Sequence, residues 1–306
     1  MKKALQKTAN LLILNLQNTV DLGLLRGRMG VVIFLYHYAR HASKPVYSDQ
    51  ADELLDELFA ALHGTLPPYF SDGVAGIGFG LNYLIKNRFI ETDDDLDELF
   101  KEVDNQLSGT AQQQFSFDPL SIGFYILSRI KTGQRTPQKN KLVSTFLAGV
   151  QAIYTDEQPL ASPSFTNSVI YCLFEIHRYG FYKKKVEKIL KMILRFVNNS
   201  FDSTSYSYAD ITVLKNILCS IELSEKLADK ILRKANQLDL SPDDDSNIDS
   251  ISQSIKQYIF YPNIEDASIS NFSIDKYLDS HIFELSTSDL LSLVYIGLDK
   301  MNVKLI

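Results

Sequence analysis

The sequence predicts an all-α protein and, within that class, an (α/α)6 toroid: a double ring of six inner and six outer helices. Three observations support this prediction. Segments that are apolar on nearly every side recur along the chain, the first of them about 46 residues apart. Segments with a single apolar stripe alternate with them. No convincing run alternates between apolar and polar residues, which is the pattern of a strand.

The clearest of the all-round apolar segments spans 71–84 and opens with two glycines three residues apart, Gly73 and Gly76. Segment 24–38 has the same form, and a fixed period of this length indicates an array of helical repeats. A helix that is apolar all round is a buried helix. The period continues with decreasing fidelity at 116–129, 165–176, 208–218 and 286–298. We predict six buried inner helices, with core side chains at Val31, Ile77, Phe79, Phe124, Ile170 and Leu293.

The segments with one apolar stripe are the predicted outer helices, at 5–16, 51–62, 96–107, 142–153, 186–197 and 227–238. Thr92 is the expected N-cap of the third, and Pro137 marks the start of the fourth. The lysine run 183–185 is expected on a solvated face. A polar acidic loop, 241–249, begins a long insert that ends at 273, before the last inner helix.

Inner helices that are buried on both faces favour closure of the double ring. An open solenoid of helical hairpins is the alternative architecture. It predicts that both helices of each pair are partly exposed.

The composition describes a globular chain without a nucleic-acid or membrane signature. The 306 residues carry a formal net charge of −6, whereas a nucleic-acid partner would favour a basic face. No stretch approaches the roughly 20 apolar residues of a membrane span. The N-terminal run LLIL is too short for the core of a signal peptide, and two cysteines give no disulfide framework. We expect a single cytoplasmic domain over 1–306, with no nucleic acid and no membrane as partners.

The first two repeats read Gly27-Arg-Met-Gly30-Val and Asp72-Gly-Val-Ala-Gly76-Ile-Gly. These residues resemble the Gly-x-x-Gly-Ile repeat of the lanthionine synthetase C-like family. The resemblance covers the whole chain as a repeat pattern and is most specific over the first three repeats. It implies an (α/α)6 toroid in which each inner helix begins with this motif, and a role in peptide modification.

Cyclases of that family add a cysteine thiol to a dehydrated residue of a peptide, and a zinc ion lowers the pKa of that thiol. The resemblance places the zinc ligands as a cysteine before the fifth inner helix and a Cys-His pair before the sixth. Here those places read Ser203-Thr-Ser-Tyr-Ser-Tyr208 and His281-Ile-Phe-Glu-Leu-Ser286, without a cysteine. We therefore expect no zinc, no other cofactor and no cyclase activity. The resemblance then implies a scaffold for a peptide substrate or a maturation-enzyme partner.

Polar side chains stand at the starts of the predicted inner helices, among them Thr166, Asn167 and Ser288. In a closed ring all six starts face one end, so these side chains are expected around one cavity mouth. Helix N-termini aimed at a cavity create a positive potential, which arginines reinforce for a carboxylate or phosphate. We expect at least one Arg–Asp pair there. The candidate binding residues at the mouth are Arg26, Arg28, Asp72, Asp118, Tyr208, Asp210 and Asp289.

The aspartates of this set have a second interpretation as N-caps, which accept from free backbone N–H groups. That interpretation fits Asp72 and Asp118 best, since each precedes a glycine or proline at a helix start. Asp210 and Asp289 replace a small residue there and are expected to face the cavity.

A glycoside hydrolase-like enzyme is the alternative function. It would use two of the four mouth aspartates, with carboxylates roughly 5–9.5 Å apart. The chain has no tryptophan to serve as a sugar platform, which weighs against this alternative.

The other reactive residue types favour structural roles. Cys172 and Cys219 lie within apolar helical segments and are expected in the core. His37 and His41 share a helix face, but they lie late in the first inner helix, up to roughly 20 Å from its start, so a metal site is not expected. His281 is expected to be a surface histidine.

Overall fold

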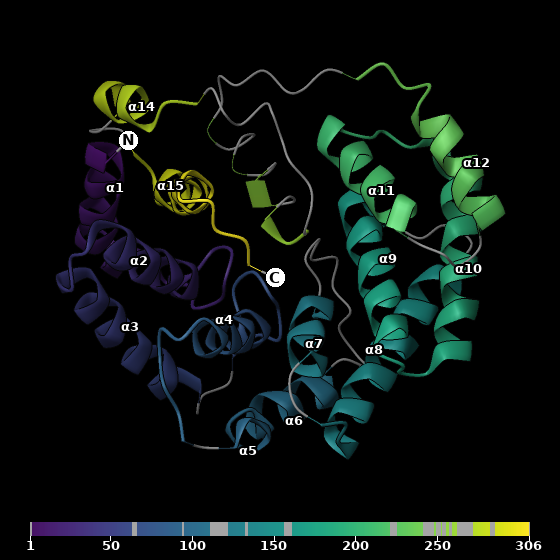
Figure 1. The fold of residues 1–306 in the computed structure, drawn as a ribbon, viewed down its shortest axis with the longest axis horizontal. Helices are drawn as coiled ribbons and strands as arrows, with labels where there is room; N and C mark the ends of the chain where they lie inside the picture. The colour runs from purple at the N-terminus through teal and green to yellow at the C-terminus, as the bar shows by residue number, and fades with distance from the viewer. Residues whose placement is uncertain are drawn as a thin grey trace. The chain divides into compact units, whose positions relative to one another are not determined.

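The structure is a computed structural model, and it describes residues 2–62, 66–93, 95–110, 122–131, 134–155, 161–220, 225–240, 248, 252, 255–256, 259–261, 272–281 and 285–305. These residues form helices and loops and contain no strand, so the all-α prediction is confirmed for them. The chain divides into two compact units, one made of Met1–Thr92 with Pro242–Ile306 and the other of Asp93–Ser241 (Figure 1).

The first unit combines both ends of the chain. Its helices are α1 (Lys2–Leu14), η1 (Leu16–Asn18), α2 (Arg28–Ala42), α3 (Val46–Leu62), α4 (Val74–Lys86), α14 (Ile274–His281) and α15 (Thr287–Lys300). Helix α14 follows the predicted insert and was not expected from the sequence pattern. Helix α2 packs against α1, α3, α4 and α15. The first and last of the predicted inner helices, α2 and α15, are therefore neighbours.

Close approach of backbone atoms holds the starts of α2 and α4 together. The N–H of Leu24 donates to the carbonyl of Phe70 at 3.2 Å, and the N–H groups of Leu25 and Arg26 donate to the carbonyl of Ser71 at 2.9 Å each. A Cβ atom on Gly76 would lie 2.0 Å from the Phe70 carbonyl oxygen and 2.5 Å from the backbone nitrogen of Leu24. The glycine of the repeat motif is required here because only a residue without a side chain lets these segments touch.

The second unit stacks helical hairpins in two layers. Its helices are α5 (Leu96–Leu99), α6 (Lys101–Thr110), α7 (Gly123–Ile130), α8 (Pro137–Thr155), α9 (Pro163–Arg178), α10 (Lys183–Ser200), η2 (Phe201–Ser203), α11 (Tyr208–Ser220) and α12 (Glu225–Ala235). Predicted inner helices pack on one another, with α9 between α7 and α11. Predicted outer helices do the same, with α8 contacting α6 and α10, and α10 contacting α12.

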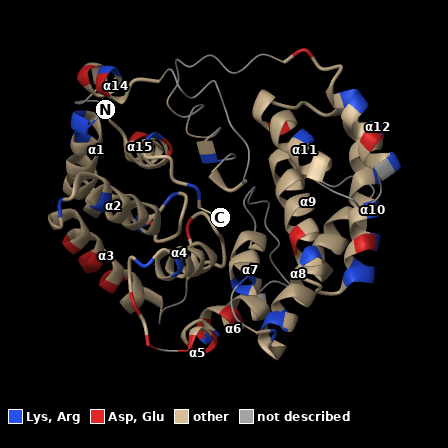
Figure 2. Ribbon diagram, viewed as in Figure 1, with Lys and Arg blue, Asp and Glu red and all other residues tan. Residues whose placement is uncertain are grey.

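The burial pattern matches the sequence pattern. All six predicted core side chains, from Val31 in α2 to Leu293 in α15, are at most 4% exposed. On α3 the acids at 52, 53, 56 and 57 are exposed opposite the buried stripe, and on α10 the lysines 183–185 are exposed (Figure 2). The solvated lysine face is thus confirmed.

The predictions of one helix N-cap and of the burial of one cysteine were wrong, and the prediction of one helix start was confirmed. The N-cap of α5 is Asp95, not Thr92, and its carboxylate accepts from the N–H of Asp97 at 3.0 Å. Cys219, in the last turn of α11, is exposed, whereas Cys172 is buried as expected. Helix α8 begins at Pro137 as predicted.

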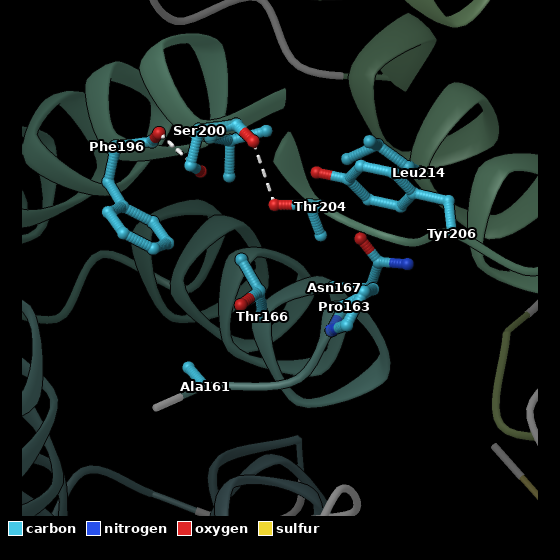
Figure 3. A pocket seen from close by; sticks show the side chains of 10 residues that line it. Ala161, Pro163, Thr166, Asn167, Phe196, Ser200, Thr204, Tyr206 and Leu214 are labelled. Carbon is cyan, nitrogen blue, oxygen red and sulfur yellow. Dashed lines mark hydrogen bonds between the residues drawn. The ribbon is translucent and has the colours of Figure 1, made fainter. Parts of the chain in front are cut away.

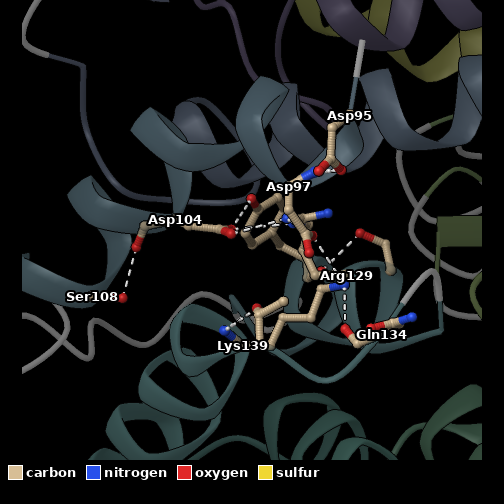
Figure 4. A network of polar contacts seen from close by, with 10 residues as sticks. Asp95, Asp97, Asp104, Ser108, Arg129, Gln134 and Lys139 are labelled. Atoms are coloured by element: carbon tan, nitrogen blue, oxygen red, sulfur yellow. Dashed lines mark hydrogen bonds and ion pairs between the residues drawn. The ribbon is translucent and has the colours of Figure 1, made fainter. Parts of the chain in front are cut away.

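A buried ionic network joins the first helices of the second unit (Figure 4). The Arg129 side chain, 1% exposed, pairs through Nη2 with Asp104 Oδ2 at 3.1 Å and with Asp97 Oδ1 at 2.9 Å. Tyr125 donates its hydroxyl to Asp104 at 2.5 Å, and Lys139 pairs with Asp97 at 3.0 Å. Burial alone would raise the pKa of Asp97, but hydrogen bonds from Lys139 and Arg129 hold that pKa below its ordinary value. The network ties α5, α6, α7 and α8 together.

Candidate functional site

The first candidate site is a cavity of about 500 Å³ in the first unit, between the segment before α2 and the start of α15. We call it the α2–α15 pocket. It contains two of the polar residues expected at helix starts, Arg26 and Ser288, and a lysine from the insert that the sequence pattern did not predict. The residues used below are Thr19, Asp21, Arg26, Lys256, Thr287 and Ser288.

The first two residues of α15, Thr287 and Ser288, line this pocket. Ser286 is the N-cap, and its hydroxyl accepts from the N–H of Asp289 at 3.2 Å. Asp289 accepts in return from the N–H of Ser286 at 2.8 Å and from its hydroxyl at 2.7 Å. The backbone N–H groups of Thr287 and Ser288, which lie between Ser286 and Asp289 in the chain, have no acceptor within helix α15. Both residues line the pocket, so these donors can serve a ligand.

The two arginines of the first repeat have different surroundings. Arg26 is exposed at the pocket and makes no ion pair with any described residue. Arg28 donates through Nε to the carbonyl of Thr19 at 2.9 Å and pairs with Glu57 of α3. It therefore supports the pocket wall at Thr19. No Arg–Asp pair forms at Arg26 or Arg28 among the described residues; the acidic partner of Arg28 comes from its own hairpin.

Among the described residues, cations outnumber carboxylates in the pocket lining. Arg26 and Lys256 contribute two cations, and Asp21 contributes one carboxylate. The Lys256 ammonium lies 5.1 Å from the centre of the Tyr295 ring, a cation–π distance. Such a lining, with helix N–H groups beside it, can hold a carboxylate.

The second candidate site is a cavity of about 320 Å³ in the second unit (Figure 3). We call it the α9–α11 pocket. Its walls come from the start of α9, the end of α10, the loop after η2, and α11. Thr166 and Asn167, both expected at a helix start, line it together with Thr204 and Tyr206, which the sequence analysis did not single out. Thr204 and Tyr206 do not occupy a position of the glycine repeat, so the repeat pattern of the sequence could not identify them.

Asp210 lies beside this second pocket, at the first turn of α11, which begins at Tyr208. One carboxylate oxygen accepts from the N–H of Ser207 at 3.1 Å and from its hydroxyl at 2.8 Å. The other accepts from the Ser164 hydroxyl at 2.7 Å. The backbone carbonyl of Asp210 accepts from Asn167 Nδ2 at 2.8 Å. Asp210 therefore caps its own helix and joins α9 to α11.

For the three described aspartates of the set, the capping assignments differ from those expected. Asp210 and Asp289, expected to face a cavity, each form a reciprocal pair with the serine three residues earlier. The signal was present in the sequence, because Ser-x-x-Asp precedes both helices and a serine with an acid three residues later is a capping-box pattern.

Asp72, expected as an N-cap, is not one: Gly73 is the N-cap of α4, without a side-chain cap bond. The Ser71 hydroxyl lies 3.5 Å from the Asp72 carboxylate. Asp118 lies outside the described residues.

The described histidines and cysteines do not gather into a site. Tyr83 and His37 share a hydrogen bond of 2.8 Å, and burial lowers the pKa of His37 to about 4, so its ring is neutral near pH 7. His41 and His281 are exposed. Burial raises the pKa of the Cys172 thiol far above its ordinary value. Within the described ranges no three His, Cys, Asp or Glu side chains lie close enough to hold a metal ion.

None of the helices in the described part of the chain is long and apolar enough to cross a membrane. Comparisons with protein-family models, with curated proteins and with solved structures find no match to this chain.

Proposed function

We propose that this chain is a zinc-free relative of the lanthionine synthetase C-like proteins that binds a peptide as a scaffold, without cyclase activity. Its ligand is a carboxylate-bearing peptide segment, and it binds in the α2–α15 pocket. The proposed architecture is the closed (α/α)6 toroid.

The observation that carries this proposal is the donor set of the α2–α15 pocket. Arg26, Lys256 and the first two residues of α15, Thr287 and Ser288, line one cavity. Guanidinium and backbone N–H groups are the donors that proteins use for carboxylates. A glutamate or aspartate side chain of a peptide supplies the matching acceptor, and the cavity volume suffices for a side chain with its flanking backbone.

Two further observations support the family and its toroid. The Gly-x-x-Gly motif stands at the starts of α2 and α4, where its glycines permit close backbone contact. Helix α15 packs against α2, as a closed ring requires of its last and first inner helices. The segments 203–208 and 281–286, which resemblance would assign to zinc ligands, hold no cysteine.

A peptide titration tests the proposed function. The probe is an acetylated, amidated pentapeptide with a central glutamate among alanines, carrying a fluorescent label, and binding is measured by anisotropy. Replacement of Arg26 by glutamine should weaken binding about tenfold, because one charge-assisted hydrogen bond, about 1.4 kcal/mol, is lost. Added salt should weaken binding by the wild-type protein more than binding by the variant.

The matched control is Arg195→Gln, which removes the same charge from an exposed position on α10. It should bind the peptide as the wild type does. A peptide with alanine in place of glutamate should not bind. The proposal fails if both peptides bind equally, or if the two variants have the same affinity.

A further inference from the structure

The described residues that line the α9–α11 pocket carry no charge, which indicates the class of ligand that they can bind. No lysine, arginine, aspartate or glutamate is among the described residues that line it. A charged ligand would lose hydration on entering and would meet no opposite charge in return. The pocket therefore favours a neutral ligand, and its volume of about 320 Å³ fits a small molecule or one side chain.

The amide oxygen of a buried asparagine residue points into this pocket. Asn167, 2% exposed, donates through Nδ2 to the backbone carbonyl of Asp210 at 2.8 Å. Because a carbonyl can only accept, the amide nitrogen must face Asp210, and this fixes the orientation of the amide group. Oδ1 then turns toward Thr204 and Tyr206, as Figure 3 shows. No group among the described residues donates to it, so the acceptor is open to a ligand.

A hydroxyl donor lies on the same side of the pocket. Burial raises the pKa of Tyr206 to about 12, so its hydroxyl stays protonated near neutral pH. The Tyr206 ring stacks on Phe201, with centroids 4.8 Å apart, which holds the hydroxyl in place. Thr204 directs its own hydroxyl to the carbonyl of Ser200 at 2.8 Å, and its side chain is also the hydrogen-bond partner of Tyr206, a contact that a ligand carbonyl would replace. Around these polar groups the walls are apolar, at Pro163 and Leu214.

We propose that the α9–α11 pocket binds a primary carboxamide. The NH₂ group of the ligand donates to Asn167 Oδ1, and its carbonyl oxygen accepts from the Tyr206 hydroxyl. A carboxamide is neutral and carries a donor and an acceptor on one carbon atom, as this pair of protein groups requires. The proposal uses no residue of the α2–α15 pocket, so it stands or fails independently of the proposed function.

A titration followed by nuclear magnetic resonance of the ¹⁵N-labelled full chain tests this proposal. The probe is butyramide, compared with butyrate, which has the same shape but is charged and has no N–H group. Butyramide should shift the backbone signals of the lining residues with a dissociation constant on the order of 10 mM, as expected for so small a ligand. Butyrate should leave these signals unchanged.

Two tyrosine variants locate the binding. Tyr206→Phe removes the hydroxyl and keeps the stacked ring, and it should weaken butyramide binding by about fivefold, the effect of one hydrogen bond. Tyr179→Phe is the control, since Tyr179 is an exposed tyrosine of the same unit that does not line the pocket. Its affinity for butyramide should equal that of the wild type.

A third variant removes the acceptor itself. Asn167→Ala should abolish the shifts. Asn167 also joins α9 to α11, so its replacement can prevent folding. In that case the comparison of Tyr206→Phe with Tyr179→Phe tests the proposal.

The source of the carboxamide is distinguished by N-acetylglutamine methylamide, which carries peptide groups on both sides of a glutamine. Its binding would assign a peptide glutamine, and binding of butyramide alone would assign a free small amide; either result supports a carboxamide site. The proposal is overturned if butyrate binds as tightly as butyramide, if Tyr206→Phe leaves affinity unchanged, or if butyramide causes no shift at the lining residues.

Discussion

At the scale of single residues, the buried charges of this chain are paired, and their pairing decides their effect on stability. Arg129 and Asp104 are each 1% exposed and meet through two hydrogen bonds. Removing a charge from water is costly, so a buried arginine without its carboxylate would strongly disfavour the folded state. The exposed pair of Lys234 with Asp202, at 2.8 Å, keeps most of its hydration and contributes little.

These two pairs give a direct prediction. Asp104→Asn should lower the free energy of unfolding by about 3–5 kcal/mol, because the Arg129 charge then lacks its main partner. Asp202→Asn should change it by less than about 1 kcal/mol. Urea denaturation followed by circular dichroism measures both. Equal effects for the two variants would mean that the buried network gives no net stabilisation.

At the scale of helices, the glycine motif acts through contact between elements. A Cβ atom on Gly76 of α4 would lie 2.5 Å from the backbone nitrogen of Leu24, in the segment before α2, and one on Gly80 of α4 would lie 2.3 Å from Met29 Cγ of α2. Gly297 in α15 meets the Phe34 ring of α2 in the same way, at 2.4 Å. These contacts let α2 approach its neighbours closely, which explains why glycine recurs at the period of the helical repeat.

The glycines of two helices provide the second prediction. Gly76→Ala should destabilise the protein by about 1–3 kcal/mol or more, because backbone atoms block the added methyl group. Gly109→Ala, in α6, has open space within 4 Å and should stabilise by about 0.5–1 kcal/mol through helix propensity. Thermal unfolding should therefore move in opposite directions for the two variants. A gain in melting temperature for Gly76→Ala would show that the close contact is not required.

At the scale of the whole molecule, both units repeat one arrangement of helical hairpins. Predicted inner helices contact inner ones, as α15, α2 and α4 do in the first unit and α7, α9 and α11 do in the second. A solenoid and a toroid share this stacking locally. They differ in whether the repeat at the end of the chain meets the one at its beginning; α15 and α2 are in contact within the first unit.

Solution scattering tests this architecture. A closed toroid of 306 residues should have the radius of gyration of a compact single domain, about 19 Å. An open superhelix of the same length would give a value several ångströms larger. Measurement by small-angle X-ray scattering on the monomeric protein decides between them, and the larger value would rule out the proposed ring.

The sequence by itself determined the helices and their buried faces. Periodicity is a local property, so the all-round apolar runs at 24–38 and 71–84 identified α2 and α4, and the single stripe at 186–197 identified α10 with its solvated lysines. The serine–aspartate caps of α11 and α15 were equally local and could have been recognised from Ser-x-x-Asp alone.

Only the tertiary structure decided which polar groups meet. The Tyr295 hydroxyl donates to the carbonyl of Leu24, 271 residues away, and Arg28 pairs with Glu57 of α3. The orientation of the Asn167 amide depends on a carbonyl 43 residues further along the chain. A repeat pattern shows which face of each helix is buried, but it does not show which neighbour covers that face. Both pockets are made at such long-range contacts, so their linings became known only when the helices were packed.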